Sequence, residues 1–310
     1  MTERERTRRG PLVVAGISVL WFAGTLWFTH AAALNAADPS IALIDAALAL
    51  PLLIAAGLVA GAAVGVVVVT RLLSSGRIER TRWAVLAGAG AGLVLGGIAG
   101  GLVLLAYGTA PSLVSLAIAM AVAAATGGAA GGVPWPAVVV AGVVGSLVRF
   151  GLGLVEGLFS GQLREAIATD DSVAAQYAAI GRVSFAMALL GGAAAGLTAS
   201  WYLRRTDSGL KWPAHLAAGA TPGLMLLVAD LATRVGGGPL LRVATGNDIA
   251  DQIALDLVGK SRLSTALVVL FTGAIAAIVS HGRTLGTTPE PDPAPKGRTT
   301  PARGPQRRRR

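Results

Sequence analysis

The sequence predicts an all-α protein, a polytopic bundle of about eight transmembrane helices with both termini in the cytoplasm. The 310-residue chain is 54% hydrophobic and only 14% charged, whereas a soluble domain carries about 25% charged residues. Its apolar residues come in runs of about 20 or more, enough to cross roughly 30 Å of hydrocarbon as a helix. These runs do not alternate apolar with polar positions, as the strands of a membrane barrel would.

The apolar runs are separated by short connections. We place the spans at residues 11–30, 43–70, 84–107, 112–133, 135–159, 182–203, 213–233 and 263–281. The first span has a basic start but is too long for a typical signal peptide, so we expect it to be retained; cleavage after Ala31–Ala33 is the alternative. Only residues 131–136 separate the fourth span from the fifth. Pro134 and Pro136 favour a turn there over a continuous helix.

The basic residues predict the orientation. With the N-terminus inside, 19 of the 26 Lys and Arg residues fall in cytoplasmic segments, as the positive-inside rule requires. The net charge of +10 is therefore explained by topology, and we expect no nucleic-acid partner. Since the basic tails lie at the membrane surface, they are expected to attract anionic lipid headgroups.

We divide the chain into three parts. Residues 1–10 are a basic cytoplasmic tail, 11–283 the transmembrane helical domain, and 284–310 a disordered Pro- and Arg-rich cytoplasmic tail. Two outer segments, 160–181 and 235–262, are long enough for structure of their own. The second has apolar residues at helical spacing from Ile249, which predicts a short amphipathic helix on the outer surface. We find no convincing repeat, because the two halves of four spans do not visibly match.

Glycine recurs at every fourth position in three spans. The residues are Gly57, Gly61 and Gly65 in the second span, Gly88, Gly92, Gly96 and Gly100 in the third, and Gly192 and Gly196 in the sixth. Small residues on one face let helix backbones approach closely, which is the main source of helix association in lipid. The pattern predicts tight static packing, with sliding of helices in a transporter as the alternative.

Charged residues inside the spans are the candidate site. The fifth span has Arg149 and Glu156, seven positions apart, and the seventh has Asp230 and Arg234, four apart, so each pair shares a helix face. Such residues are costly in hydrocarbon, which favours a polar ion or substrate site; the alternative is pairing or snorkelling that fixes helix depth. Because Glu156 lies about 10 Å beyond Arg149 along the axis, we expect Asp230 to be the partner of Arg149.

Proline inside the seventh span is a further candidate feature. Pro222 follows Gly219 and precedes Gly223. Proline removes a backbone donor and favours a kink. Interrupted helices near the midplane are also where transporters place their sites, so a plain kink and a site remain open.

The sequence excludes several chemistries. It has no cysteine, and its three histidines, His30, His215 and His281, have no metal-ligand spacing, so we expect no metal and no cofactor. Nucleophile-elbow, zincin and P-loop motifs are missing, so we expect no enzyme. The expectation is a multi-pass protein of the inner cell membrane, a non-enzymatic accessory or scaffolding component of the cell envelope that can have other membrane subunits as partners. The alternative is a secondary transporter or permease subunit with a site around Arg149, Glu156 and Asp230, and a third interpretation is an intramembrane enzyme.

Overall fold

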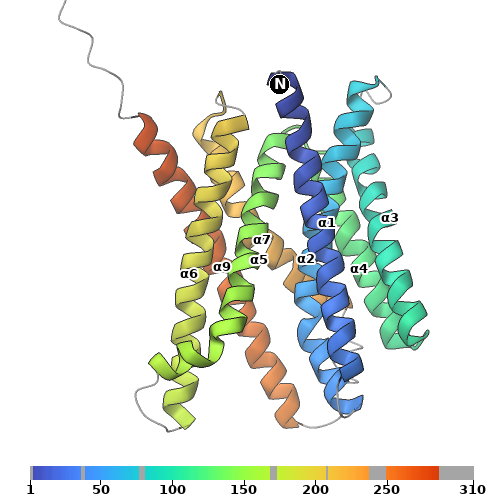
Figure 1. Cartoon of the computed structure of the whole chain (residues 1–310), viewed down its shortest axis with the longest axis vertical. Helices are drawn as coiled ribbons and strands as arrows, with labels where there is room; N and C mark the ends of the chain where they lie inside the picture. Colours follow the sequence, from blue (N-terminus) through green and yellow to red (C-terminus); the bar gives the residue numbers. More distant parts are fainter. Residues whose placement is uncertain are drawn as a thin grey trace, which may run out of the picture.

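The computed structural model is a bundle of helices that stand side by side (Figure 1). It describes residues 3–35, 39–76, 81–167, 173–206, 209–236 and 249–285. The helices are α1 (Glu3–Asn35), α2 (Pro39–Ser74), α3 (Thr81–Tyr107), α4 (Pro111–Ala130), α5 (Pro136–Ile167), α6 (Val173–Thr206), α7 (Trp212–Gly236) and α9 (Ile249–Leu285). All eight are long and apolar enough to cross a membrane, as the sequence predicts.

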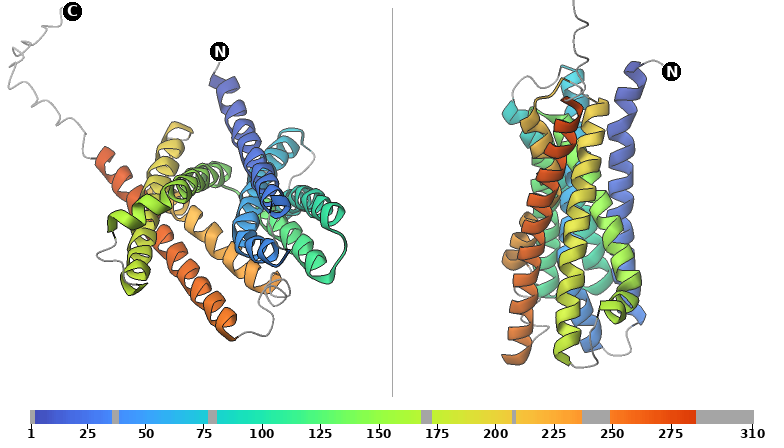
Figure 2. Two further views of the ribbon diagram at one scale, coloured as in Figure 1. Left: turned by 60° about the horizontal axis from the view of Figure 1, so that its bottom comes forward. Right: turned by 90° about the vertical axis from the view of Figure 1, so that its left-hand side faces the viewer.

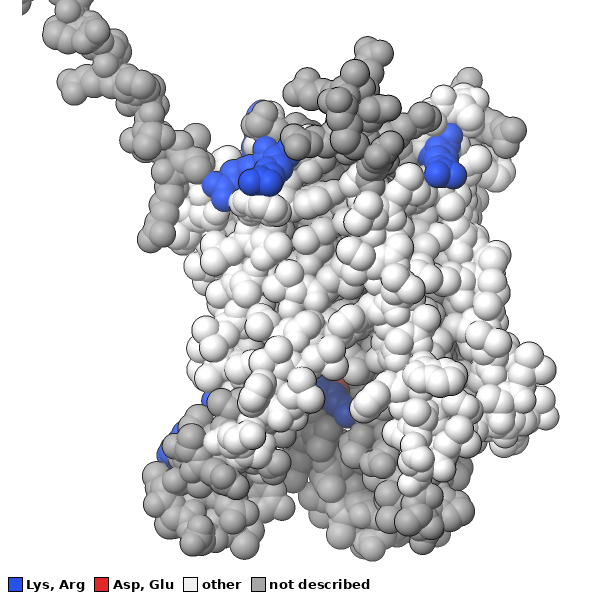
Figure 3. Space-filling model, viewed as in Figure 1, with Lys and Arg blue, Asp and Glu red and all other residues white. Residues whose placement is uncertain are grey.

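The start of α1 and the end of α9 lie on the same side of the bundle, which we call the N-terminal side (Figure 1). Lys and Arg side chains gather at this side above a wide apolar belt (Figure 3). Exposed aromatic side chains mark both rims of the belt, for example Trp83 and Trp212 at the N-terminal side and Trp27 at the opposite side. Amphipathic rings prefer the membrane interface, so this distribution fits a bundle embedded in lipid.

The break predicted between the fourth and fifth spans is present. Helix α4 ends at Ala130 and α5 begins at Pro136, where a missing backbone donor costs nothing. The turn between them packs tightly, since a Cβ on Gly131 would overlap the backbone of Val66 on α2, and one on Gly132 the backbone of Val85 on α3. Glycine therefore lets this connection lie directly against two helices.

The prediction of a separate amphipathic helix after Ile249 is wrong. This segment is helical, but it is the first part of α9, which runs without interruption from Ile249 to Leu285. No proline separates the two parts, and a single glycine, Gly259, costs a helix only about 1 kcal/mol. The other outer segment is also largely helical, because α5 continues to Ile167 and α6 begins at Val173.

In the first half of the chain, α4 lies between α2 and α3. The glycines that face it are Gly61 and Gly65 on α2 and Gly88, Gly92, Gly96 and Gly100 on α3. Two residues of α4, Ala124 and Gly128, are approached from both sides: added Cβ atoms on the facing glycines would overlap their carbonyl oxygens. Gly57 instead faces the ring of Phe22 on α1, at 3.4 Å from an added Cβ. Backbone contact of this kind is possible only without side chains.

In the second half, α9 lies between α6 and α7 in the same manner (Figure 2). A Cβ on Gly192 would lie 2.9 Å from the Cα of Val269, and one on Gly196 would overlap the carbonyl of Gly273. From the other side, a Cβ on Gly219 would lie 2.5 Å from the same Gly273 carbonyl oxygen. Helix α9 therefore has a glycine at the point where two other helices meet it.

The two halves thus repeat one packing pattern, contrary to the expectation from the sequence. The positions correspond at two constant shifts along the sequence. A shift of 131 positions takes Gly61, Gly65, Gly88 and Gly92 to Gly192, Gly196, Gly219 and Gly223. A shift of 145 positions takes Ala124 and Gly128 to Val269 and Gly273. Residues 58–65 and 189–196 are identical at five of eight positions. The match is easily overlooked because small apolar residues are abundant throughout the chain. Helices α1 to α4 therefore correspond in order to α5, α6, α7 and α9.

The halves meet along α2, the most deeply buried helix, which packs against both α5 and α7. Trp21 of α1 stacks on Phe150 of α5 with ring centroids 5.8 Å apart. Helix α7 continues through Pro222. The ring of Pro222 is fully buried and lies 3.0 Å from where a Cβ on Gly145 of α5 would be. The proline thus fills a notch between α5 and α7.

Candidate functional site

Arg149 and Glu156 form an ion pair along α5. Their nearest atoms, Nη2 and Oε2, are 3.9 Å apart, and their side chains are 14% and 25% exposed. The guanidinium lies over Gly191 of α6, where an added Cβ would come within 2.6 Å of the Arg149 Cδ. Its Nε is buried and has no hydrogen-bond partner among the described residues. The pair is therefore loose, and one donor of the guanidinium is unused.

The expectation that Glu156 lies too far from Arg149 for direct contact is wrong. Gly153 lies between them on the same helix face, and an added Cβ there would be 3.3 Å from Nη1 of Arg149. Because Gly153 has no side chain, the long arginine side chain extends along the helix toward the carboxylate. The axial separation of about 10 Å is bridged by the combined reach of the two side chains.

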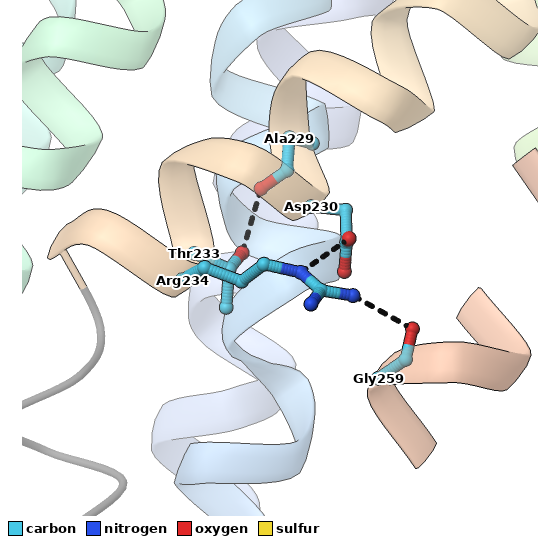
Figure 4. A network of polar contacts seen from close by, with 5 residues as sticks. All are labelled: Ala229, Asp230, Thr233, Arg234 and Gly259. Carbon is cyan, nitrogen blue, oxygen red and sulfur yellow. Dashed lines mark hydrogen bonds and ion pairs between the residues drawn. The ribbon is translucent and has the colours of Figure 1, made fainter. Parts of the chain in front are cut away.

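Asp230 and Arg234 form a second, separate pair one turn apart on α7 (Figure 4). Nε of Arg234 donates to Oδ2 of Asp230 at 2.8 Å, and Nη2 donates to the carbonyl oxygen of Gly259 at 3.0 Å. Asp230 is buried, whereas the side chain of Arg234 is half exposed. Arg262 of α9 also interacts electrostatically with Asp230. This cluster ties the last turns of α7 to α9.

The predicted partnership of Arg149 with Asp230 is therefore replaced by two pairs, each within one helix. Among the described interactions, Arg149 contacts Glu156 and Asp230 contacts Arg234. On the face seen in Figure 3, basic and acidic atoms show in a recess below the middle of the apolar belt.

A third polar cluster, which the sequence analysis missed, lies between α6, α7 and α9 at the N-terminal side. The rings of His215 and His281 stack with centroids 4.3 Å apart. Ser200 Oγ lies 3.1 Å from Nδ1 of His215 and donates to the carbonyl oxygen of Ala277 at 3.4 Å. Arg204 donates to Ser280, with 2.9 Å from Nη2 to Oγ. We call Ser200, Arg204, His215, Ser280 and His281 the histidine cluster.

Two members of the histidine cluster are buried, Ser200 fully and His215 with 2% exposed, whereas Arg204, Ser280 and His281 are partly exposed. Sequence spacing gave no signal, because the histidines are 66 positions apart (215 and 281) and belong to different helices. The available signal was topological, since both lie near the same rim of the predicted bundle. The remaining histidine, His30, lies at the opposite side, where its Nδ1 is 2.8 Å from the hydroxyl of Tyr107.

Among the described residues, no group of three or more His, Asp or Glu side chains could hold a metal ion. Comparisons with protein-family models, with curated proteins and with solved structures found no match.

Proposed function

We propose that this chain is a non-enzymatic integral protein of the inner cell membrane that serves as an accessory or scaffolding component for other membrane proteins. The observation that carries the proposal is the pairing of the deep charges. Arg149 with Glu156, and Asp230 with Arg234, each close within one helix. Charges paired in this way stabilise helices, and they do not converge on a common ligand.

The glycine packing supports the same proposal. Backbone contacts along α4 and α9 interlock each half of the bundle, and a closely packed helix can slide only if many contacts are broken together. The outward faces are broad and apolar, with Leu93, Ile98 and Leu105 of α3 among the exposed residues. Such a bundle presents fixed surfaces to lipid and to neighbouring helices.

The test combines two measurements on the full chain. The tagged protein, solubilised in mild detergent from its own membranes, is expected to migrate in a complex of defined size and composition. The purified protein in liposomes is expected to leave solute and proton gradients unchanged. A gradient that collapses only when the protein is present would contradict the proposal.

A second candidate is a secondary transporter or permease subunit, favoured by one observation. The buried Nε of Arg149 has no partner among the described residues, and a guanidinium stays charged at this depth. An incoming carboxylate or phosphate group is the ligand such a donor fits.

Substitution at Arg149 separates the two candidates. A transporter predicts that Arg149→Lys and Arg149→Ala both lose flux while the protein still inserts and stays folded, because lysine lacks the planar fork. If the chain is a scaffold, the same two substitutions should lower its thermal stability, and the unsubstituted protein should show no flux. Liposome flux and thermal unfolding of the same preparations give the answer.

A further inference from the structure

The histidine cluster differs from the corresponding region of the first half. Helices α6 and α7 correspond to α2 and α3 at a shift of 131 positions, so Ser200 corresponds to Val69 and His215 to Ala84. Val69 and Ala84 are both buried, at 4% and 3% exposed. Valine and alanine therefore fill the corresponding positions of the first half in the same packing arrangement. The fold itself does not require a serine at position 200 or a histidine at position 215.

The fourth helix of each half, α4 and α9, differs as well. Helix α4 ends at Ala130, and a glycine turn packs against Val66 of α2 and Val85 of α3. Helix α9 instead continues to Leu285, ten residues beyond Ile275, the position that corresponds to Ala130. This extension brings Ser280 and His281 against α6 and α7. The second half thus has an added polar contact that holds the end of α9.

The described charge nearest His215 is positive. Arg204 and His281 both interact electrostatically with His215. The other titratable side chains described in the second half at this rim are Tyr202 and Arg205 of α6 and Lys211 just before α7; Arg205 lies over the Trp201 ring at 4.1 Å. Arg71 of α2 and Arg82 of α3 lie at the same rim in the first half. Among the described side chains of α6, α7 and α9, the one carboxylate is Asp230, at the far end of α7. A proton added to His215 therefore meets the positive charge of Arg204.

Imidazole is the side chain whose charge changes between pH 5 and 8. We propose that the stacked His215–His281 pair is a proton-binding site that releases the N-terminal-side end of α9 from α6 and α7. The proton comes from the aqueous phase at this rim and adds to a ring nitrogen of the pair. The imidazolium is then repelled by Arg204 and by the second ring, and α9 moves away with Ser280 and His281.

Linkage fixes the direction of the response. The closed form, with neutral rings, binds fewer protons than the released form, in which the rings face water. Lower pH therefore favours release, and higher pH favours the closed form. Release of the α9 end is compatible with a scaffold and with a transporter alike, because it changes the position of one helix end only.

Spin labels give a direct test, since the chain has no native cysteine. Labels on cysteines at Thr206 of α6 and Gly282 of α9 report the distance across the contact in the full chain in lipid nanodiscs. The distance is expected to increase as pH falls from about 8 to about 5. The matched control carries labels at Ser75 and Ala137, the positions 131 and 145 residues earlier in the first half, and its distance is expected to stay constant.

Substitutions copied from the first half test the assignment. His215→Ala and Ser200→Val restore the residues that the corresponding positions carry, so the protein should fold. His215→Ala combined with His281→Ala is expected to abolish the change in distance. Arg204→Gln is expected to move its midpoint to lower pH, because the closed form then meets one repelling charge fewer and tolerates the imidazolium better. A constant distance in the unsubstituted pair, a response that survives loss of both histidines, or an unchanged midpoint in Arg204→Gln would overturn the proposal.

Discussion

At the scale of single residues, the Arg149–Glu156 pair is asymmetric. A carboxyl group that loses its partner can become neutral by taking up a proton, whereas a guanidinium remains charged. Arg149 is also the more buried of the two, with 14% of its side chain exposed against 25% for Glu156. The main effect of the pair is therefore to give the buried charge of Arg149 a counter-charge.

This asymmetry predicts the outcome of two substitutions. Glu156→Gln leaves the guanidinium without its counter-charge and should lower the free energy of unfolding by about 1 to 3 kcal/mol. Arg149→Met fills similar space without charge and should cost less. Thermal unfolding of both variants in the same detergent measures the difference, and a larger loss for Arg149→Met would show that the pair is not the main restraint.

The Asp230 cluster gives a second prediction for individual side chains. Asp230→Ala removes the carboxylate that faces Arg234 and Arg262 and should destabilise the contact between α7 and α9 by about 2 to 4 kcal/mol. The triple change Asp230→Ala, Arg234→Val and Arg262→Ala introduces the residues of the corresponding positions, Ala99, Val103 and Ala117, and should recover much of that loss.

Unfolding midpoints of the single and triple variants decide this prediction. Recovery in the triple variant would mean that the cluster is compatible with the fold but not required by it. If the triple variant were the least stable, the two halves would not be interchangeable at these positions.

At the scale of helices, the face of α3 decides how it packs. Gly96 faces α4, where an added Cβ would lie 2.7 Å from the Cα of Ala121, whereas the adjacent Gly97 has nothing within 4 Å of an added Cβ. The two glycines differ only in the direction they face. They therefore form a matched pair for testing helix contact.

Gly96→Leu should force α3 away from α4 and lower the unfolding midpoint clearly, since overpacking costs about 1 to 3 kcal/mol or more. Gly97→Leu should leave the midpoint nearly unchanged, because its side chain enters lipid. The comparison is made by thermal unfolding in detergent and in lipid. Equal effects of the two substitutions would mean that helix propensity, and not contact with α4, determines the result.

At the scale of the whole molecule, the orientation in the membrane follows from the basic rim. We expect the N-terminal side to face the cytoplasm, because Arg71, Arg82, Arg204 and Lys211 lie there. Ser75→Cys on this side and Thr109→Cys on the opposite side are both exposed positions. An impermeant maleimide added to intact cells should label Thr109→Cys and not Ser75→Cys. The reverse labelling would invert the bundle.

The sequence by itself determined the eight spanning helices found among the described residues, with their approximate bounds. Hydropathy does this locally, because every backbone group in hydrocarbon must be satisfied within its own helix. It also located the prolines that separate α4 from α5. It failed at the start of α9, where apolar residues at helical spacing suggested a separate amphipathic helix although the backbone simply continues.

Only the tertiary structure decided which residues meet. Lipid tails are as apolar as the helices, so hydropathy has no information about which helix faces which. The placement of α4 and α9 between their neighbours, the stacking of His215 on His281 and the correspondence of the two halves all depend on helix order and rotation in space. Arg149 reaches Glu156 partly for a reason of the same kind. The room at Gly153 is local to α5, but the guanidinium lies over Gly191 only once α5 packs against α6.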